Sequence, residues 1–368
     1  MTSRVRTVAV VGATHGNELS GLYLARHLIK SGAGARSPVP PLSFRGVVAN
    51  PEAAKRCARY VDEDLNRCFT LERLAGSEST YEARRARALN QELGPKGAHS
   101  KTDYVLDLHN TTANTGVLLC FHRNDALSRE LLGHLRRLDP SIRAAFWDFD
   151  DPPFLPSIGR LGGMTVEAGP VAHGTLNTRI MSRVRRLLDE VQDYLECLNA
   201  SDADSPRVKQ AVLIGHRVAQ VDFPRDEHGD LAGFLHPDLQ GAPELSPPRF
   251  LRPGQPLFVD VEGATVEAFH PAKFAGSWRP ADAFPGAAAP ASAWAAPVEL
   301  YPLFSNEAAY LEKRVAFYLN RLVPYDVDVL SEEFMRRARR SSGFPPVAER
   351  APHVRQEQRE GGRTPGAL

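Results

Sequence analysis

Three residues, His15, Glu18 and His109, have side chains and a spacing suited to binding one catalytic metal ion. His15 and Glu18 are three residues apart and follow an apolar run at 8–13, so a tight turn or a first helical turn can direct both at one point. His109 follows a second apolar run, Tyr104–Leu108, which is expected to be a strand. Two imidazoles and one carboxylate suit zinc and leave a fourth coordination position for water. We therefore predict one Zn²⁺ per chain, bound by these three residues.

A simpler interpretation fits each of these segments taken alone. An isolated His-x-x-Glu sequence is common at capped helix starts, and His109 could be a hydrogen-bonded histidine at the edge of a sheet. The two segments together, with the polar residues between and beyond them, favour the metal site.

A carboxylate at the end of another expected strand, Glu167, is predicted to be the general acid and base. Hydrolysis by a metal-activated water needs a group that takes the proton of the water and returns it to the leaving amine. Taken alone, Glu167 could equally be an ordinary exposed carboxylate. Asp107 lies two residues before His109, on the same strand face, and can orient the imidazole, and Asp64 is a second candidate for that role. His173 follows a Gly-Pro turn and is by default a loop histidine.

The segment at 56–67 combines many charges without helical or strand periodicity. Its Asn66-Arg67 pair is suited to holding a carboxylate, because the arginine fork gives two donors and the asparagine adds a neutral one. Arg59 can place a second cation near negative charge that develops during the reaction. A surface loop with scattered charges is the alternative.

Residues 1–200 alternate segments typical of strands and helices, which predicts an α/β fold with a mixed sheet flanked by helices. The expected strands are Val5–Ala13, Leu42–Ala49, Tyr104–Leu108, Gly116–Phe121 and Gly163–Glu167. The expected helices are Leu19–Ser31, Tyr81–Leu93, Ala126–Leu138 and Thr178–Asn199.

The second half of the chain has a different pattern. A polar, Pro-containing segment near residue 203 predicts a boundary between a catalytic domain at 1–203 and a smaller β-rich C-terminal domain at 204–325. Short β-like stretches are expected from Val208 to about Tyr301, and a helix over Phe304–Leu322. The Ala- and Pro-rich segment Ala275–Pro297 is expected to be a surface loop or lid. Residues 326–368 are expected to form a short helix that ends at Arg340 and then a disordered Arg-rich tail.

Composition narrows the class of protein. With 368 residues, 42% apolar residues and 24% charged residues, the chain has the balance of a globular protein. A formal net charge of +1 gives no reason to expect nucleic acid or an anionic membrane as a partner. The four cysteines form no C-x-x-C pair, which argues against a disulfide framework and fits a cytoplasmic location. A homo-oligomer is compatible with the sequence.

The chain resembles the aspartoacylase and aminoacylase 3 family, zinc deacylases related to carboxypeptidases and to succinylglutamate desuccinylase. The resemblance runs from about Val8 to Phe317, with matching stretches at 12–21, 59–67, 107–112, 223–229, 235–237 and 306–310. It implies a carboxypeptidase-like sheet, followed by a β-rich domain that narrows the entrance to the active site.

The resemblance also assigns roles to single residues. It implies that His15, Glu18 and His109 bind the metal and that Glu167 is the general acid and base. Arg59 would polarise the scissile carbonyl, and Asn66 with Arg67 would hold the α-carboxylate of the substrate. Tyr310 would reach the site from the C-terminal domain, and Asn110 is also expected to bind substrate.

The sequence departs from this family after Glu167, where mammalian members have a Pro-Gln-Pro-Gln type of turn. The arginine that binds the side-chain carboxylate of aspartate in aspartoacylase has no secure counterpart either. Counting back from Glu167 places Ser157 there, and Arg160 reaches the position only if the loop is reshaped. Strict selectivity for N-acetyl-aspartate is therefore not expected.

The resulting hypothesis is a zinc-dependent amidohydrolase that removes a short acyl group, most simply acetyl, from a small-molecule N-acyl amino acid. Two alternatives remain open. One is a desuccinylase or small-peptide carboxypeptidase of the same superfamily, and the other is a non-catalytic zinc-binding interaction protein.

Overall fold

The computed structural model describes residues 4–31, 42–274 and 299–342, and the expected loop at Ala275–Pro297 and the tail after residue 342 lie outside these ranges. The described strands are β1 (Thr7–Gly12), β2 (Ser43–Val48), β3 (Tyr104–Asn110), β4 (Gly116–Phe121), β5 (Arg143–Phe146), β6 (Gly163–Gly169), β7 (Arg207–Val221), β8 (Phe234–Leu235), β9 (Pro256–Val259), β10 (Thr265–Ala268), β11 (Tyr301–Leu303) and β12 (Phe317–Leu330). The α-helices are α1 (Leu19–Ser31), α2 (Pro51–Arg56), α3 (Leu71–Ala75), α4 (Tyr81–Leu93), α5 (Ala126–Leu138), α6 (Thr178–Asn199) and α7 (Glu332–Ser342).

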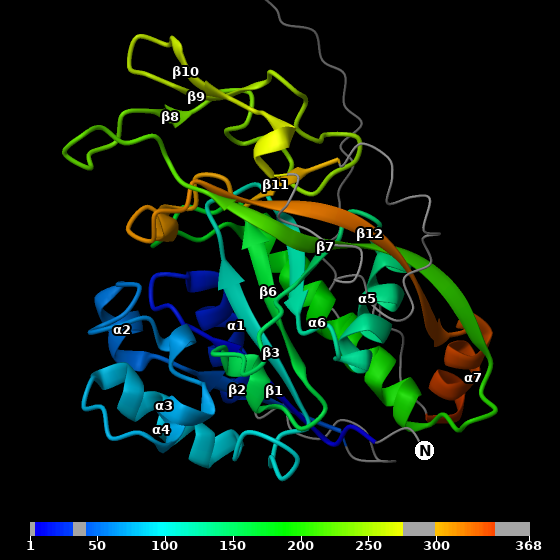
Figure 1. Cartoon of the computed structure of the whole chain (residues 1–368). Helices are drawn as coiled ribbons and strands as arrows, with labels where there is room; N and C mark the ends of the chain where they lie inside the picture. Colours follow the sequence, from blue (N-terminus) through cyan, green and yellow to red (C-terminus); the bar gives the residue numbers. More distant parts are fainter. Residues whose placement is uncertain (1–3, 32–41, 275–298, 343–368) are drawn as a thin grey trace, which may run out of the picture.

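A nine-stranded mixed sheet forms the centre of the molecule, in the order β11-β12-β7-β5-β4-β6-β3-β1-β2 (Figure 1). The strands β2, β1, β3 and β6 are mutually parallel, whereas β4 is antiparallel to β6 and β12 is antiparallel to β7 and β11. A separate sheet of three antiparallel strands, β10-β9-β8, lies beyond the end of the main sheet that carries β11 and β12 (Figure 1). The predicted α/β class with a mixed sheet and a smaller β-rich part is confirmed.

Both faces of the main sheet are covered, which explains why its strands are continuous apolar runs. Along β1, Val8 and Val10 face one core, which includes side chains of α1, α5 and α6. Ala9 and Val11 face a second core, which includes side chains of α4. Alternate residues of each central strand therefore belong to different faces, and this alternation decides which side chains share a site.

The four helices expected in the first half begin and end at the predicted residues, and the five expected strands are present with ends that differ by at most two residues. The short elements α2, α3 and β5 were not predicted, because segments of four to six residues carry little periodicity.

The helix expected over Phe304–Leu322 is wrong. The structure has only a single 3-10 turn there, at Ala308–Tyr310, followed by strand β12. From Val323 to Val329, buried and exposed residues alternate, which is the burial period of a strand. Long antiparallel pairing of β12 with β7 outweighs the local signal.

Strands β7 and β12 lie mostly within the range predicted as a second domain, and both complete the main sheet. The domain boundaries stay a prediction.

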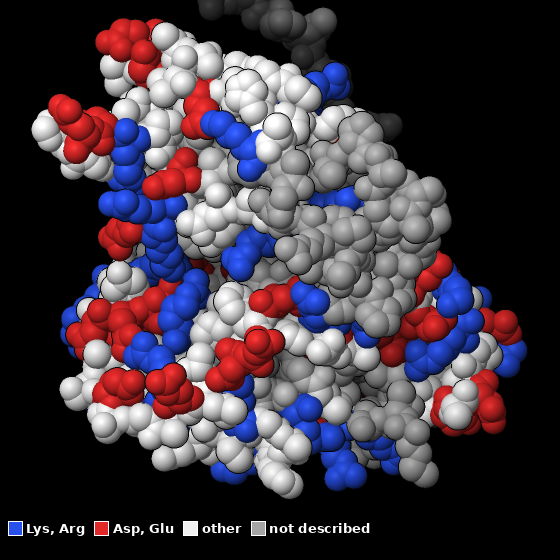
Figure 2. Space-filling model, in the orientation of Figure 1, with Lys and Arg blue, Asp and Glu red and all other residues white. Residues whose placement is uncertain are grey.

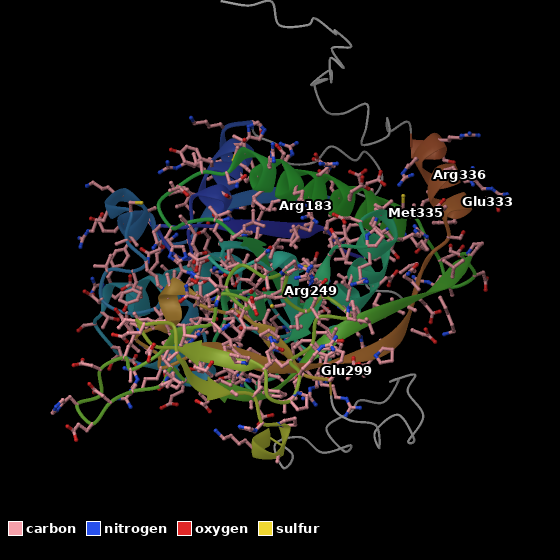
Figure 3. All side chains as sticks on the ribbon, turned by 90° about the horizontal axis from the view of Figure 1, so that it is seen from above. Arg183, Arg249, Glu299, Glu333, Met335 and Arg336 are labelled. Carbon is pink, nitrogen blue, oxygen red and sulfur yellow. The ribbon has the colours of Figure 1, made fainter. Side chains whose placement is uncertain are left out.

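Helix α7 corresponds to the short helix expected after residue 326. Its Met335 is buried, while Glu333 and Arg336 point away from the body of the molecule (Figure 3).

Acidic and basic side chains are interspersed over the described part of one face, without a large patch of one sign (Figure 2). Within the described ranges, the structure holds no helix with the length and apolar character needed to cross a bilayer.

The segment just before β1 is hydrogen-bonded to the end of α6 by the buried Asn199. Asn199 accepts a hydrogen bond from the backbone nitrogen of Val5 at 2.8 Å and donates one to its carbonyl oxygen at 2.5 Å. We expect Asn199→Ala to lower the free energy of unfolding by about 2 kcal/mol, because it leaves two buried backbone groups without partners. Urea unfolding measures this loss. Gln192→Ala on the partly exposed side of α6 is the matched control, and an equal loss in both variants would contradict the assignment.

Candidate metal centre and active site

Side chains from two separate strand ends converge in the candidate metal cluster, which consists of His15, Glu18 and His109. Each offers a ligand atom, and these atoms lie within 4.8 Å of one another. The Nδ1 atom of His15 lies 2.7 Å from Glu18 Oε1, and the Nδ1 atom of His109 lies 2.9 Å from Glu18 Oε2. The two Nδ1 atoms are 3.1 Å apart. All three side chains are buried, so the cluster predicted from the sequence is assembled in the fold.

The opposite nitrogen of each imidazole is held by a carboxylate. His15 Nε2 lies 2.9 Å from Asp64 Oδ1, and His109 Nε2 lies 2.9 Å from Asp107 Oδ2. Thr14 donates a hydrogen bond of 2.6 Å to the other oxygen of Asp107. Ionised carboxylates only accept hydrogen bonds, so Asp64 and Asp107 favour the tautomer with the hydrogen on Nε2, which leaves the Nδ1 lone pairs for a metal ion.

This arrangement fits a zinc ion. In this tautomer two imidazole lone pairs and a carboxylate face one another within 3.1 Å, which is unfavourable unless a positive charge lies between them. Zinc binds histidine nitrogen at about 2.0 Å, so two nitrogens on one tetrahedral ion lie about 3.3 Å apart. The observed Nδ1 separation is close to this value.

The electrostatics of the cluster favour positive charge at the same place. Burial lowers the pKa of His109, but the carboxylates of Asp107 and Glu18 outweigh burial and raise that pKa well above its usual value. Burial likewise raises the pKa of Glu18, but the imidazoles of His15 and His109 outweigh it and hold the pKa well below its usual value.

The turn between β1 and α1 is held by Asn110 at the end of β3. Its side-chain oxygen accepts from the backbone nitrogen of Ser20 at 3.0 Å, and its side-chain nitrogen donates to Ala168 O at 3.2 Å. Its backbone nitrogen donates to Glu18 Oε2 at 2.9 Å. Asn110 therefore positions a side chain of the candidate metal cluster, and its expected contact with substrate stays a prediction.

The carboxylate of Glu167 lies beside the candidate metal cluster. Glu167 and His109 are register partners in the parallel pair β6 and β3, and both point to the same face of the sheet. The Glu167 residue is only 8% exposed, and burial raises its pKa to about 8. Among the described residues, none donates a hydrogen bond to this carboxylate, so its oxygens are available to a water molecule or a substrate.

Arg59 reaches the cluster from the loop after α2. Its guanidinium lies 3.3 Å from Glu18 Oε1 and 3.4 Å from Asp64 Oδ2. Burial lowers the pKa of Arg59, but Asp64 and Glu18 outweigh burial and raise it, so the group stays charged. Its distances to both carboxylates are at the long end of hydrogen bonding, which leaves this cation able to turn toward a developing oxyanion.

The predicted carboxylate clamp lies on the next turn of the chain. Asn66 is buried, and its side-chain oxygen accepts from the backbone nitrogen of Leu155 at 3.1 Å, which leaves the amide nitrogen for other contacts. The Arg67 guanidinium donates to the carbonyl oxygen of Asn66 at 2.8 Å and lies over the Phe154 ring at 5.2 Å. No acidic side chain among the described residues pairs with Arg67.

Tyr310 from the C-terminal part of the chain lies beside this clamp. Burial raises the pKa of Tyr310 well above its usual value, with smaller effects from Glu167 and Arg67 that indicate proximity to both. Glu307 caps the 3-10 turn that carries Tyr310 and accepts hydrogen bonds from the hydroxyl of Thr111 and, at 2.8 Å, from the backbone nitrogen of Thr112. The end of β3 thereby fixes the position of Tyr310.

Lys313 is a residue of the site that the sequence did not indicate. Lys313 donates to Asp64 Oδ2 at 2.8 Å and lies 5.5 Å from the ring centre of Tyr310. It links the C-terminal segment to the carboxylate that holds His15. No local pattern could have revealed it, because the two partners are 249 residues apart in sequence.

Neither Ser157 nor Arg160 offers a free positive charge for the side-chain carboxylate of an aspartate substrate. Ser157 donates to the backbone carbonyls of Pro152 and Phe154, and the Arg160 guanidinium is bound to Asp103, at 2.9 Å through Nε. His173 lies in a loop, as expected, and its Nε2 atom is 3.4 Å from Glu307, the residue that caps the turn carrying Tyr310.

Known proteins resemble this chain over most of its length. Residues 4–195 match the family described as Succinylglutamate desuccinylase/Aspartoacylase catalytic domain. The N-acyl-aromatic-L-amino acid amidohydrolase (carboxylate-forming) of Mus musculus is 37% identical over 331 residues, 88% of this chain and 92% of that protein. The aspartoacylase of Rattus norvegicus is 32% identical over 321 residues, 85% of this chain and 91% of that protein. The crystal structure of murine aminoacylase 3 superposes with a TM-score of 0.75 at 36% identity, covering 90% of this chain and all of that one.

Because Asp64 and Asp107 hold the imidazoles in one orientation, we expect Asp64→Asn and Asp107→Asn each to weaken zinc binding about 10- to 100-fold. Competition with a chromophoric chelator measures the affinity. Asp328→Asn on the exposed edge of β12 is the matched control. Unchanged affinity in both site variants would show that these carboxylates do not orient the ligands.

Proposed function

This chain belongs to the succinylglutamate desuccinylase/aspartoacylase family, and we propose that it is a zinc-dependent amidohydrolase that cleaves the acyl group, acetyl in the simplest case, from N-acyl amino acids. The products would be a carboxylate and the free amino acid. The observation that carries the proposal is the convergence of both Nδ1 atoms and the Glu18 carboxylate on one point, with Glu167 beside it.

The residues around the cluster supply the proton transfers and the charge stabilisation of this reaction. Zinc, when bound, supplies Lewis-acid polarisation of the amide carbonyl and activates a water molecule. A carboxylate oxygen of Glu167 accepts the proton of the attacking water and later delivers it to the nitrogen of the leaving amine. The Arg59 guanidinium donates hydrogen bonds to the oxygen on which negative charge develops.

Arg67 and Asn66 would bind the α-carboxylate of the substrate. The absence of an acidic partner for Arg67 among the described residues supports this role, because a partly buried guanidinium without a carboxylate is suited to an anionic ligand. Substrates without this carboxylate should therefore react poorly.

For the side chain of the substrate, we infer a preference for aromatic over acidic groups. The Arg67 guanidinium lies on Phe154, and Phe154 packs on Trp147 at 4.5 Å. Neither Ser157 nor Arg160 provides a free cation that could bind an acidic side chain. The aromatic ring of Phe154, in contrast, lies beside Arg67 and packs on Trp147. The name of the murine relative, which acts on N-acyl-aromatic amino acids, supports the same preference.

A substrate panel on the zinc-loaded protein tests this function. It contains N-acetyl-phenylalanine, N-acetyl-tyrosine, N-acetyl-aspartate, N-succinyl-glutamate and dipeptides with a free C-terminus. We expect the aromatic N-acetyl amino acids to be hydrolysed fastest. Turnover of only the succinyl compound or the dipeptides would favour a desuccinylase or a carboxypeptidase. Zinc binding without any turnover would indicate a non-catalytic protein.

The role of Glu167 predicts that Glu167→Gln retains zinc and lowers kcat about 10²- to 10⁴-fold, because the amide accepts no proton from water. Steady-state kinetics and metal analysis of the same preparation provide the two measurements. Glu312→Gln, which changes an exposed carboxylate on the C-terminal segment, is the control and should stay active. A fully active Glu167→Gln protein would exclude this mechanism.

The role of Arg67 predicts that Arg67→Leu lowers kcat/KM for N-acetyl-phenylalanine about 100-fold, because a charge-assisted hydrogen-bond pair is lost. N-acetyl-phenylalanine amide has no carboxylate, so its slow hydrolysis should change less than twofold. Arg67→Lys should lie between these limits, because it keeps the charge and loses the fork. An equal loss for both compounds would show that Arg67 acts on folding or on another step.

A further inference from the structure

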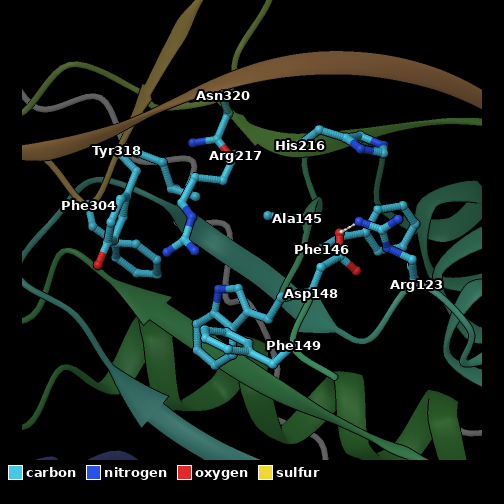
Figure 4. A pocket seen from close by; sticks show the side chains of 12 residues that line it. Arg123, Ala145, Phe146, Asp148, Phe149, His216, Arg217, Phe304, Tyr318 and Asn320 are labelled. Atoms are coloured by element: carbon cyan, nitrogen blue, oxygen red, sulfur yellow. Dashed lines mark hydrogen bonds and ion pairs between the residues drawn. The ribbon is translucent and has the colours of Figure 1, made fainter. Parts of the chain in front are cut away.

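A cavity of about 210 Å³ lies next to the candidate active site, beneath strands β7 and β12 (Figure 4). Aromatic rings form much of its wall, and several polar side chains also face it. Its lining includes Trp147, Asp148, Phe149, Arg217, Tyr318 and Asn320.

The cavity and the active site share their aromatic walls. Phe304 and Tyr318 line the cavity, and each packs against Tyr310 with ring centres 5.7 Å apart. On the other side, Trp147 lines the cavity and packs on Phe154, the ring beneath the Arg67 guanidinium. The cavity therefore lies on the far side of the rings that would flank a substrate bound at Arg67.

Arg217 is the unusual residue of this cavity. Its guanidinium lies 5.3 Å from the ring centre of Tyr318 and 5.8 Å from that of Phe149, and it points into the space between them (Figure 4). It makes no ion pair with any acidic side chain among the described residues. The other arginine of the cavity differs, because Arg123 pairs with Asp148 at 2.6 Å. Of the two arginines of the cavity, Arg217 is therefore the one whose charge no carboxylate balances.

Two further polar atoms in the cavity wall are buried without a hydrogen-bond partner. The side-chain nitrogen of Asn320 is one, on a residue that is only 1% exposed. The second oxygen of Asp148 is the other. Buried polar atoms are normally satisfied, so an unpartnered donor close to an unpaired cation indicates a place for a ligand acceptor.

We propose that this cavity is the distal subsite for the substrate side chain and that it binds a flat aromatic group ending in a carboxylate or another anionic acceptor. The inference rests on the proposed function. The ring of the ligand would lie among Trp147, Phe149 and Tyr318, and its anionic end would accept hydrogen bonds from Arg217 and Asn320. Asp148 is neutralised by Arg123, and its free oxygen can accept from a ligand hydroxyl or amine.

Kinetics on two matched substrates test the subsite. Wild-type protein and Arg217→Leu are compared on N-acetyl-4-carboxyphenylalanine and N-acetyl-4-methylphenylalanine, which differ in charge at the distal position. We expect Arg217→Leu to lower kcat/KM about tenfold for the carboxylate compound and less than twofold for the methyl compound. Arg217→Lys should restore part of the loss. Lys209→Leu removes a positive charge from the far end of the same strand and should change neither value.

A binding measurement separates this inference from the proposed function. Trp147 lies in the cavity wall, so its fluorescence should change when free 4-carboxyphenylalanine binds, and Trp147→Phe should abolish the change. If the protein hydrolyses no N-acetyl amino acid but this signal is present and Arg217→Leu weakens binding about tenfold, the subsite is supported and the proposed function is wrong. If both substrates are hydrolysed and Arg217→Leu affects them equally, the subsite is overturned and the proposed function stands. Absence of the fluorescence change also overturns the subsite.

Discussion

The carboxylates of Asp64 and Asp107 impose the constraint on which the site depends. Each holds the Nε2 atom of one imidazole at 2.9 Å, and this fixes both rings with their Nδ1 lone pairs directed at Glu18. Without these partners, either ring can rotate or exchange tautomers, and the three ligand atoms no longer face one point. Burial strengthens the constraint, because a misdirected polar atom in this environment has no water to compensate it.

The sheet supplies the second condition, which is that the right side chains share a face. Asp107 and His109 are two residues apart on β3, and Glu167 is the register partner of His109 on β6. A shift of one residue in this register would move Glu167 to the opposite face, into the apolar core that contains Val166 and Ala168. The arrangement of base and ligand is thus a property of strand pairing.

The C-terminal segment completes the site from a distance. Glu307 accepts hydrogen bonds from the residues just after β3, Lys313 donates to Asp64, and Tyr310 lies between Glu307 and Lys313 in the chain. The same segment continues into β12, whose Tyr318 and Asn320 form part of the neighbouring cavity. One stretch of chain therefore supports the orientation of His15 in the candidate metal cluster and lines the cavity proposed for the substrate side chain.

Much of this protein followed from the sequence. Apolar runs just before His15, His109 and Glu167 predicted strands that deliver these residues to one edge of a sheet. The long amphipathic helices were predicted at their observed residues. Both signals are local and repeat every few positions, so they can be recognised without the fold. The interpretation of Phe304–Leu322 as a helix failed, because the β12 strand depends on pairing with β7, about a hundred residues earlier in the chain. Tertiary structure alone decided that Lys313 pairs with Asp64 and that Arg160 pairs with Asp103. It also decided that the guanidinium of Arg217 lies against aromatic rings without an acidic partner among the described residues. These contacts join residues far apart in sequence, and no spacing along the chain specifies which side chains then meet.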